Sequence, residues 1–164
     1  MKRLVGCLLS VLTFSSLPAA DFAAGTKAYE SGDYAAAFKE WEPLAQAGGS
    51  AAQFNLGLLY YDGHGVPQDF AEAASWFKKS ADRGYVKAQH NLGAMYAVGK
   101  GVKRDYVRAY KWLSLCAAAG ESSCEAQRDL AAKKLSSSKL ANAQRMAREW
   151  KPVESEPEQQ SQQQ

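Results

Sequence analysis

Residues 52–84 read AQFNLGLLYYDGHGVPQDFAEAASWFKKSADRG, and residues 88–120 read AQHNLGAMYAVGKGVKRDYVRAYKWLSLCAAAG. When residues 52–87 are aligned without a gap on residues 88–123, the two segments are identical at 14 of 36 positions. The identities are Ala52/Ala88, Gln53/Gln89, Asn55/Asn91, Leu56/Leu92, Gly57/Gly93, Tyr60/Tyr96, Gly63/Gly99, Gly65/Gly101, Val66/Val102, Asp69/Asp105, Ala73/Ala109, Trp76/Trp112, Ala81/Ala117 and Gly84/Gly120. Repetition with a period in this range predicts a solenoid of stacked units.

The first half of each unit is predicted to be a helix that ends in a glycine-rich loop. Ala52, Leu56 and Tyr60 recur at helical spacing and predict a helix over 51–62. The two glycines of the following loop, at 63 and 65, allow a positive φ and a tight reversal.

The second half of each unit is predicted to be another helix. Asp69 and Glu72 have the spacing of a capping box, so this helix should begin there. Gly57 and Ala73 are small enough to lie where the two helices of a unit approach most closely.

The same pattern divides the rest of the chain. We expect repeats at about 20–51, 52–87 and 88–123, followed by a partial, capping unit at 124–150. In that last unit Ala126 and Leu130 resemble Ala52 and Leu56, which predicts a helix over about 122–134. A closing helix is expected over about 138–150. Terminal repeats of a solenoid are commonly divergent and act as caps.

The two ends of the chain have other compositions. Residues 1–20 have a short basic start, an apolar run and small residues, which is typical of a secretory signal peptide. Residues 151–164 are polar and of low complexity, which predicts a disordered tail. We therefore expect a periplasmic or secreted protein without stable membrane insertion after cleavage. The remaining chain carries 18 basic and 17 acidic residues, which does not favour nucleic-acid binding.

The pattern A-x-x-x-L-G-x-x-Y-x-x-G-x-G-V-x-x-D-x-x-x-A-x-x-W-x-x-x-x-A-x-x-G occurs at 52–84 and again at 88–120. It resembles the Sel-one-like repeat (SLR) family, which is related to the tetratricopeptide repeats. The resemblance implies an all-α, right-handed α-α solenoid of antiparallel helix pairs with a C-terminal capping helix. It also implies an exported scaffold or adaptor. Some cysteine-rich members are linked to penicillin binding and β-lactamase activity, which leaves an enzyme as the alternative.

Cys116 and Cys124 are separated by seven residues and lie at the corner between two predicted helices. An exported chain meets an oxidising compartment, so a disulfide is expected there. The spacing also resembles the disulfides within repeats of cysteine-rich SLR proteins. The alternative is a reduced pair that fills a helix contact.

The resemblance to tetratricopeptide-like stacks implies that one face of the first helices lines a concave groove. The residues we expect to bind a partner there are Tyr29, Leu58, Tyr61, Lys87, His90 and Arg128. A groove that runs from aromatic to basic suits a protein or peptide with an apolar part and an acidic end. The alternative is that Phe22, Phe54, Tyr29 and Tyr61 pack as additional core.

No catalytic site is expected. Two S-x-x-K sequences, at Ser75–Lys78 and Ser136–Lys139, match the first element of penicillin-interacting serine enzymes, but S-D-N and K-T-G do not occur. No metal-binding motif contains His64 or His90. We therefore predict a monomeric, non-catalytic binding module without a cofactor, and the alternatives are a β-lactamase-like hydrolase and a peptidoglycan-binding module.

Overall fold

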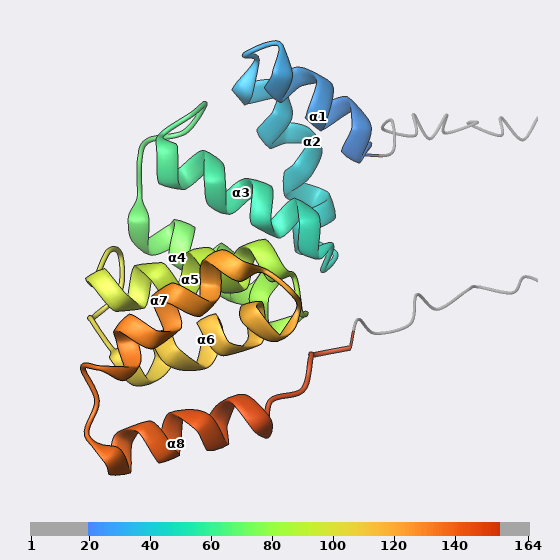
Figure 1. Ribbon diagram of the computed structural model, residues 1–164. Helices are drawn as coiled ribbons and strands as arrows, with labels where there is room; N and C mark the ends of the chain where they lie inside the picture. Colours follow the sequence, from blue (N-terminus) through green and yellow to red (C-terminus); the bar gives the residue numbers. More distant parts are fainter. Residues whose placement is uncertain (1–19, 155–164) are drawn as a thin grey trace, which may run out of the picture.

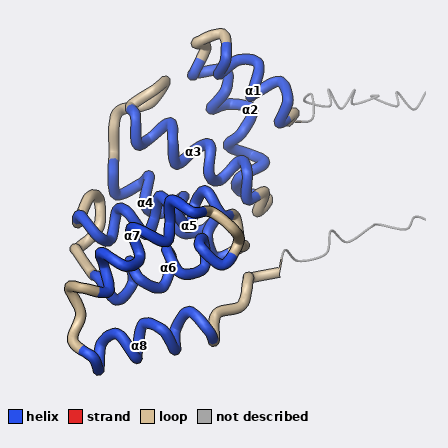
Figure 2. Tube along the Cα trace, in the orientation of Figure 1, coloured by secondary structure: helices blue, strands red, loops and turns tan. Residues whose placement is uncertain are grey.

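The computed structural model describes residues 20–154 (Figure 1). Residues 1–19 of the predicted signal peptide and residues 155–164 of the predicted tail lie outside the described residues. The described part is helical throughout, with loops between the helices (Figure 2). Its helices are α1 (Phe22–Glu30), α2 (Tyr34–Gln46), α3 (Ser50–Asp62), α4 (Phe70–Asp82), α5 (Val86–Val98), α6 (Tyr106–Ala118), α7 (Ser122–Ala132) and α8 (Ser137–Arg148).

Consecutive helices form pairs, and the pairs stack along one direction. α1 packs on α2, α3 on α4 and α5 on α6, while α2, α4 and α6 each contact the first helix of the next unit (Figure 1). The predicted all-α solenoid of stacked helix pairs is therefore confirmed.

The two glycine-rich loops end the first helices as predicted. Gly63 and Gly65 have φ angles of 71° and 72°, and Gly99 and Gly101 repeat this with 80° and 68°. Only glycine reaches this left-handed region at little cost. The loops can therefore reverse the chain directly after the helix end.

Asp69 caps α4, but in a different way from a complete capping box. Its Oδ1 accepts hydrogen bonds from the backbone nitrogens of Ala71 and Glu72 at 2.8 and 3.0 Å. The backbone N–H of Asp69, however, donates to the carbonyl oxygen of Tyr60 at 2.9 Å. The predicted reciprocal bond from this N–H to Glu72 is not formed, because the loop folds back onto the end of α3 and supplies the acceptor there.

The second and third units are each joined to the preceding one by a buried glutamine. The side-chain nitrogen of Gln53 donates to the carbonyl oxygen of Ala45 at 3.0 Å, and that of Gln89 donates to Ala81 at 3.4 Å. Each of these carbonyl oxygens also accepts a backbone hydrogen bond, from Gly48 at 3.1 Å and from Gly84 at 2.9 Å, so the glutamine is a second donor to the end of the preceding helix. This bond explains why a polar residue repeats at a buried position.

The core lies within and between the helix pairs. A Cβ atom added to Gly57 would lie 2.5 Å from the ring of Phe77, so the two helices of this unit are in close contact there, as predicted. Ala73 is fully buried on the facing helix. Trp41 and Trp112 are also buried, while Trp76 is half-buried and has Lys79 Nζ 3.8 Å above its ring.

The register predicted for α7 is wrong. Ala126 is exposed and Leu130 is 61% exposed, so neither takes the place of Ala52 or Leu56 in the core. Cys124 and Ala131 are the buried residues of this helix. Cys124 follows Ala88 by one repeat of 36 residues, and its disulfide to Cys116 fixes that residue against α6.

α8 closes the solenoid by packing on α6, and its contacts with α7 are sparse (Figure 1). After α8, residues 150–153 form a strap that returns to the end of α4. Trp150 packs edge-to-face on Trp112 with ring centroids 6.2 Å apart, and the backbone N–H of Val153 donates to the carbonyl oxygen of Asp82 at 2.8 Å. This differs from the prediction of a disordered tail beginning at 151.

Candidate partner-binding groove

Three hollows follow one another along the first helices of the units. The first lies between α1 and α3, the second between α3 and α5, and the third between α5 and α7. Leu58 lines both the first and the second, while Ala94 and Val98 line both the second and the third. These shared walls make one groove, which we call the concave groove.

The first hollow has a volume of about 260 Å³ and an aromatic wall. Tyr29 contributes its ring, which lies 5.7 Å from the ring of Trp41 and 5.2 Å from that of Tyr34. Burial raises the pKa of the Tyr29 hydroxyl above 10.0, and the carboxylate of Asp62 raises it further. The phenol is therefore neutral at physiological pH and can donate a hydrogen bond.

The second hollow has a volume of about 360 Å³ and is lined by Leu58, Tyr61 and Lys100 among others. The ammonium group of Lys100 donates a hydrogen bond of 3.0 Å to the hydroxyl of Tyr61. The ring of Tyr61 also packs edge-to-face on Phe70, with centroids 5.2 Å apart. Tyr61 thus faces the hollow but is fixed by its neighbours.

The third hollow is the most apolar part of the groove. It has a volume of about 440 Å³, and Ala97 and Ala131 form part of its wall. Two large apolar side chains beside it are exposed to solvent, since Val98 is 68% and Leu130 61% exposed. Because α8 lies on α6, no helix within residues 20–154 covers this end of the groove.

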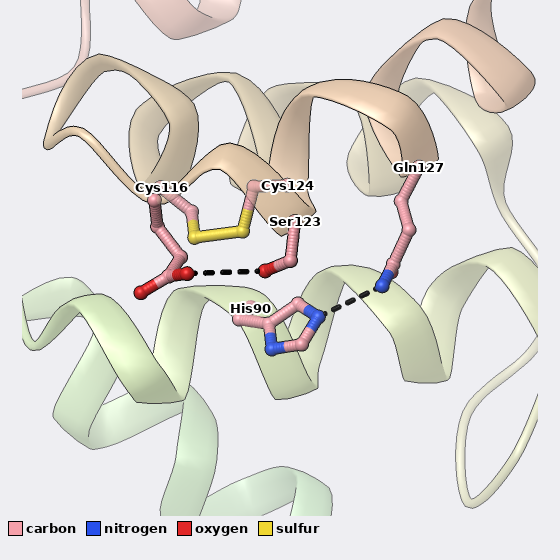
Figure 3. Close-up of a disulfide and its surroundings, with 6 residues drawn as sticks. His90, Cys116, Ser123, Cys124 and Gln127 are labelled. Atoms are coloured by element: carbon pink, nitrogen blue, oxygen red, sulfur yellow. Dashed lines mark hydrogen bonds between the residues drawn. A yellow bond between two sulfur atoms is a disulfide. The ribbon is translucent and has the colours of Figure 1, made fainter.

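Lys87, His90 and Arg128 do not line the hollows. Lys87 is exposed at the start of α5. The side-chain nitrogen of Gln127 donates to Nε2 of His90 at 2.9 Å, so this histidine joins α5 to α7 (Figure 3). Arg128 forms an ion pair with its neighbour Asp129 at 2.9 Å.

The register predicted for α7, with Ala126 and Leu130 in the places of Ala52 and Leu56, also put Arg128 one repeat after His90. One repeat of 36 residues after His90 is Ala126. The predicted register of α7 is wrong by two residues, so Arg128 does not take the position on the groove face at which it was expected.

The two phenylalanines of the predicted face have different roles. Phe54 is buried, with its ring 5.6 Å from Phe77 and 5.1 Å from Tyr85, so it belongs to the core. Phe22 lies 6.1 Å from the ring of Trp41 and is 40% exposed. The alternative interpretation as core is therefore correct for Phe54.

Three groove residues were not selected from the sequence. Asn55 lines the first hollow and Asn91 the second, at equivalent positions of two units. Both are half-buried, and neither belongs to a core cluster. The two asparagines are identical between the repeats although they are polar and do not belong to the core, and this identity could have identified them from the sequence. Lys100 gave no such signal, because its equivalent is His64.

The predicted disulfide joins Cys116 to Cys124 in the structure (Figure 3). Both residues are fully buried, and the bridge links the end of α6 to the first turn of α7. Beside it, the hydroxyl of Ser123 donates to the carboxylate of Glu121 at 3.3 Å. The bridge therefore fixes the helix that forms the last wall of the concave groove.

The two S-x-x-K sequences have structural roles. Lys78 forms an ion pair of 2.5 Å with Asp82, and Ser75 is exposed on the same helix. The hydroxyl of Ser136 accepts a hydrogen bond from the backbone N–H of Lys139 and caps α8. Among residues 20–154 there is no cluster of three or more His, Cys, Asp or Glu side chains that could hold a metal ion. None of the helices in this range is long and apolar enough to cross a membrane.

A stack of antiparallel helix pairs with an open inner groove defines an α-α repeat protein. The family model described as Sel1 repeat matches residues 50–85 and 86–121. The chain thus contains two Sel1 repeats, as the resemblance to Sel-one-like repeats implied. Such repeats typically form scaffolds for protein–protein interaction and are generally non-catalytic.

Two solved structures are similar over most of the chain. One is a protective antigen of uropathogenic Escherichia coli strains that displays an SLR fold, with a TM-score of 0.72 and 32% identity. The similarity covers 77% of this chain and 28% of that protein. The other is a Sel1 repeat protein from Oxalobacter formigenes, with a TM-score of 0.65 and 28% identity over 80% of this chain and 56% of that one.

Two curated relatives match a shorter stretch. These are the proteins named DAP3-binding cell death enhancer 1 of Rattus norvegicus and Mus musculus, each 43% identical over 49 residues. The stretch is 30% of this chain, and it spans 10% of either relative.

Proposed function

We propose that this protein is an exported, non-catalytic binding module that captures a protein or peptide in its concave groove. The observation that carries the proposal is the continuity of the three hollows, which share Leu58, Ala94 and Val98 as walls. A continuous groove can hold successive side chains of an extended or helical segment. A monomer has this groove complete, so no second copy is required.

The chemistry of the groove fits a polypeptide ligand. The surface of its walls is mostly apolar, and separate polar groups lie within it, among them the amides of Asn55 and Asn91, the carboxylates of Glu30 and Asp62 and the ammonium group of Lys100. Apolar surface provides most of the affinity at a protein interface, while separate polar groups fix the orientation of the ligand. The residues Tyr29, Leu58 and Tyr61 are the ones we propose to contact the partner first.

Export is part of the proposal and has its own support. The apolar N-terminal segment has the composition of a signal peptide, and the Cys116–Cys124 bridge suits an oxidising compartment. We therefore place the binding event in the periplasm or outside the cell. Protease protection in intact cells and after disruption of the outer membrane measures this location directly.

Site-specific photocrosslinking tests the groove. A benzoylphenylalanine at position 58 should crosslink to a partner in cells, whereas the same residue at the exposed position 75 on α4 should not. The substitution Leu58→Glu should abolish capture of that partner by the purified protein. Equal crosslinking from both positions would show that the groove is not the binding site.

The rival functions predict other results. A β-lactamase-like enzyme would hydrolyse a chromogenic β-lactam such as nitrocefin and lose this activity on substitution of one serine. A peptidoglycan-binding module would sediment with purified cell walls. Either result with full-length protein would contradict the proposed function.

A further inference from the structure

Charge is distributed unevenly along the solenoid. Between residues 21 and 98 there are nine acidic and six basic side chains. Between residues 99 and 153 there are five acidic and twelve basic ones, and the remaining three acidic residues follow at 154, 156 and 158. The near-neutral total therefore hides a strongly basic segment, residues 99–153, which includes α6, α7 and α8.

Part of this basic charge surrounds a single recess. The recess has a volume of about 540 Å³ and lies between the start of α6, the α7–α8 turn and α8. Arg104 and Arg108 line one side of it, and Lys134 and Lys139 the other. Asp105 is the one carboxylate in this lining. It already accepts two backbone hydrogen bonds and forms an ion pair of 3.5 Å with Arg108.

Three of these cations have no acidic partner within the described residues. No ion pair between residues 20 and 154 contains Arg104, Lys134 or Lys139. Arg104 has its guanidinium group 5.9 Å from the centroid of the Tyr106 ring. Like charges that converge on one recess repel each other, and an anion placed between them relieves this repulsion.

The basic recess is continuous with the apolar end of the concave groove. Tyr106 and Lys134 line both the recess and the third hollow. On one side of these two residues lie apolar side chains, including Val98 and Leu130, and on the other lie the cations. A ligand that fits both parts carries an apolar group next to negative charge.

We propose that Arg104, Arg108, Lys134 and Lys139 form an anion-binding subsite for a peptide segment in which acidic residues follow an apolar one. The inference rests on the proposed function and adds to it the chemistry and direction of the ligand. The apolar side chain lies in the third hollow, and the carboxylates that follow it lie in the basic recess. The acidic end of the partner therefore points toward α8.

A peptide fits this surface better than a membrane or a nucleic acid. The cations come from several elements around a hollow, whereas a lipid surface is broad and contacts cations on one face. A nucleic acid would need basic charge along its whole path. The first hollow instead is lined by Glu30 and the second by Asp62, which would repel phosphates.

Selection of short random peptides displayed on phage, with full-length protein as the target, tests the subsite. A recess variant carries Arg104→Gln, Arg108→Gln, Lys134→Gln and Lys139→Gln. A matched control carries Lys27→Gln, Lys39→Gln, Arg148→Gln and Lys151→Gln, which removes the same charge from exposed positions elsewhere. We expect both variants to fold, because all eight side chains are exposed, and circular dichroism checks this.

We expect the wild-type protein and the matched control to enrich peptides with acidic residues after an apolar one. Against the recess variant this acidic preference should disappear while the apolar preference remains. For an enriched peptide, replacement of Glu by Gln should weaken binding about two- to fivefold on the wild-type protein and leave binding to the recess variant unchanged. On the wild-type protein, the difference in affinity between the Glu and Gln peptides should become smaller as salt is raised from about 50 to about 500 mM.

Three outcomes overturn the inference in distinguishable ways. Enriched peptides without acidic residues, bound in a manner that Leu58→Glu abolishes, would leave the groove proposal intact and remove the subsite. Failure of every peptide to enrich above empty matrix would remove both. The third outcome is that no acidic peptide is enriched, while the wild-type protein and the matched control sediment with phosphatidylglycerol vesicles and the recess variant does not. This would assign the cations to a membrane surface.

Discussion

The ammonium group of Lys100 lies 3.0 Å from the hydroxyl oxygen of Tyr61 and 4.2 Å from the centroid of its ring. The same ammonium group lies 4.0 Å from the centroid of the Phe70 ring. Lys100 belongs to the glycine-rich loop of one unit, while Tyr61 and Phe70 belong to the unit before it. This side chain therefore joins two units and forms one end of the second hollow.

The hydroxyl and the ring of Tyr61 should contribute different amounts to stability. Tyr61→Phe should lower the free energy of unfolding by about 0.5–1 kcal/mol, because only the acceptor for Lys100 is lost. Tyr61→Ala should lower it by about 2–4 kcal/mol, because the ring packs on Phe70 and Phe77. Urea denaturation measures both, and equal losses would show that the ring is not part of the core.

The close contact at Gly57 should make a small substitution costly. Gly57→Ala should destabilise the protein by about 1–3 kcal/mol, because the added methyl group would overlap the Phe77 ring. This loss should exceed the gain of about 1 kcal/mol that alanine brings to a helix interior. Ser75→Ala on the exposed face of α4 serves as the control and should change stability by less than about 0.5 kcal/mol. A stabilised Gly57→Ala protein would contradict the observed packing.

The Cys116–Cys124 bridge should stabilise the C-terminal end of the groove. Chain entropy gives about 2.5 kcal/mol for a loop this short. Reductant should therefore lower the melting temperature of the wild-type protein. The double variant Cys116→Ala/Cys124→Ala should melt at a reduced temperature and be insensitive to reductant. An equal response of both proteins to reductant would mean that the effect does not come from this bridge.

The strap should hold α8 against the solenoid through Trp150. Trp150→Ala should lower the free energy of unfolding by about 2 kcal/mol, because its contact with Trp112 is lost while part of the ring was already exposed. The exposed Lys151→Ala is the matched control and should leave stability unchanged. Amide exchange at Val153 should become faster in the Trp150→Ala protein. Unchanged exchange would show that the strap is held by other contacts.

Tyr29 should ionise at higher pH than an exposed tyrosine. Burial and then the charge of Asp62 raise its pKa above 10.0, so Asp62→Asn should lower this pKa without restoring the ordinary value. The raised pKa means that Tyr29 contributes stability which is present below pH 10 and lost as pH rises through the folded-state pKa. Carbon NMR titration of the tyrosine rings measures both values. An unaltered Tyr29 pKa in Asp62→Asn would contradict the effect of this carboxylate.

The helix pairs and their boundaries could be predicted because local signals decide them. Asp69 and Asp105 cap the second helices, and glycines end the first ones with positive φ. These signals act within a few residues and occur twice at the same spacing. Tyr29 and Leu58 were placed beside one hollow for the same reason, since helical spacing identifies the face that the core leaves open.

The last unit could not be predicted because its neighbours differ. The 36-residue period continues into α7 with Cys124 in the place of Ala88, but the residues at this spacing are no longer identical, and the similarity of Ala126 and Leu130 to Ala52 and Leu56 gave a register that is wrong by two residues. α8 packs on α6, and periodicity gives no information about which helix a closing segment will cover. The basic recess was missed because Arg104, Lys134 and Lys139 are distant in sequence and meet only when α8 takes this position.

The glycine-rich loops have a mechanical consequence for the solenoid. A Cβ atom at Gly65 would lie 2.7 Å from the backbone of Tyr34, and His64 stacks on the ring of Tyr34 at 4.2 Å. Each such loop packs against the second helix of the unit before it, so the stack resists bending at these junctions. A pulling force applied along the chain should therefore extend the protein in steps, one unit at a time, and not as a uniformly elastic rod.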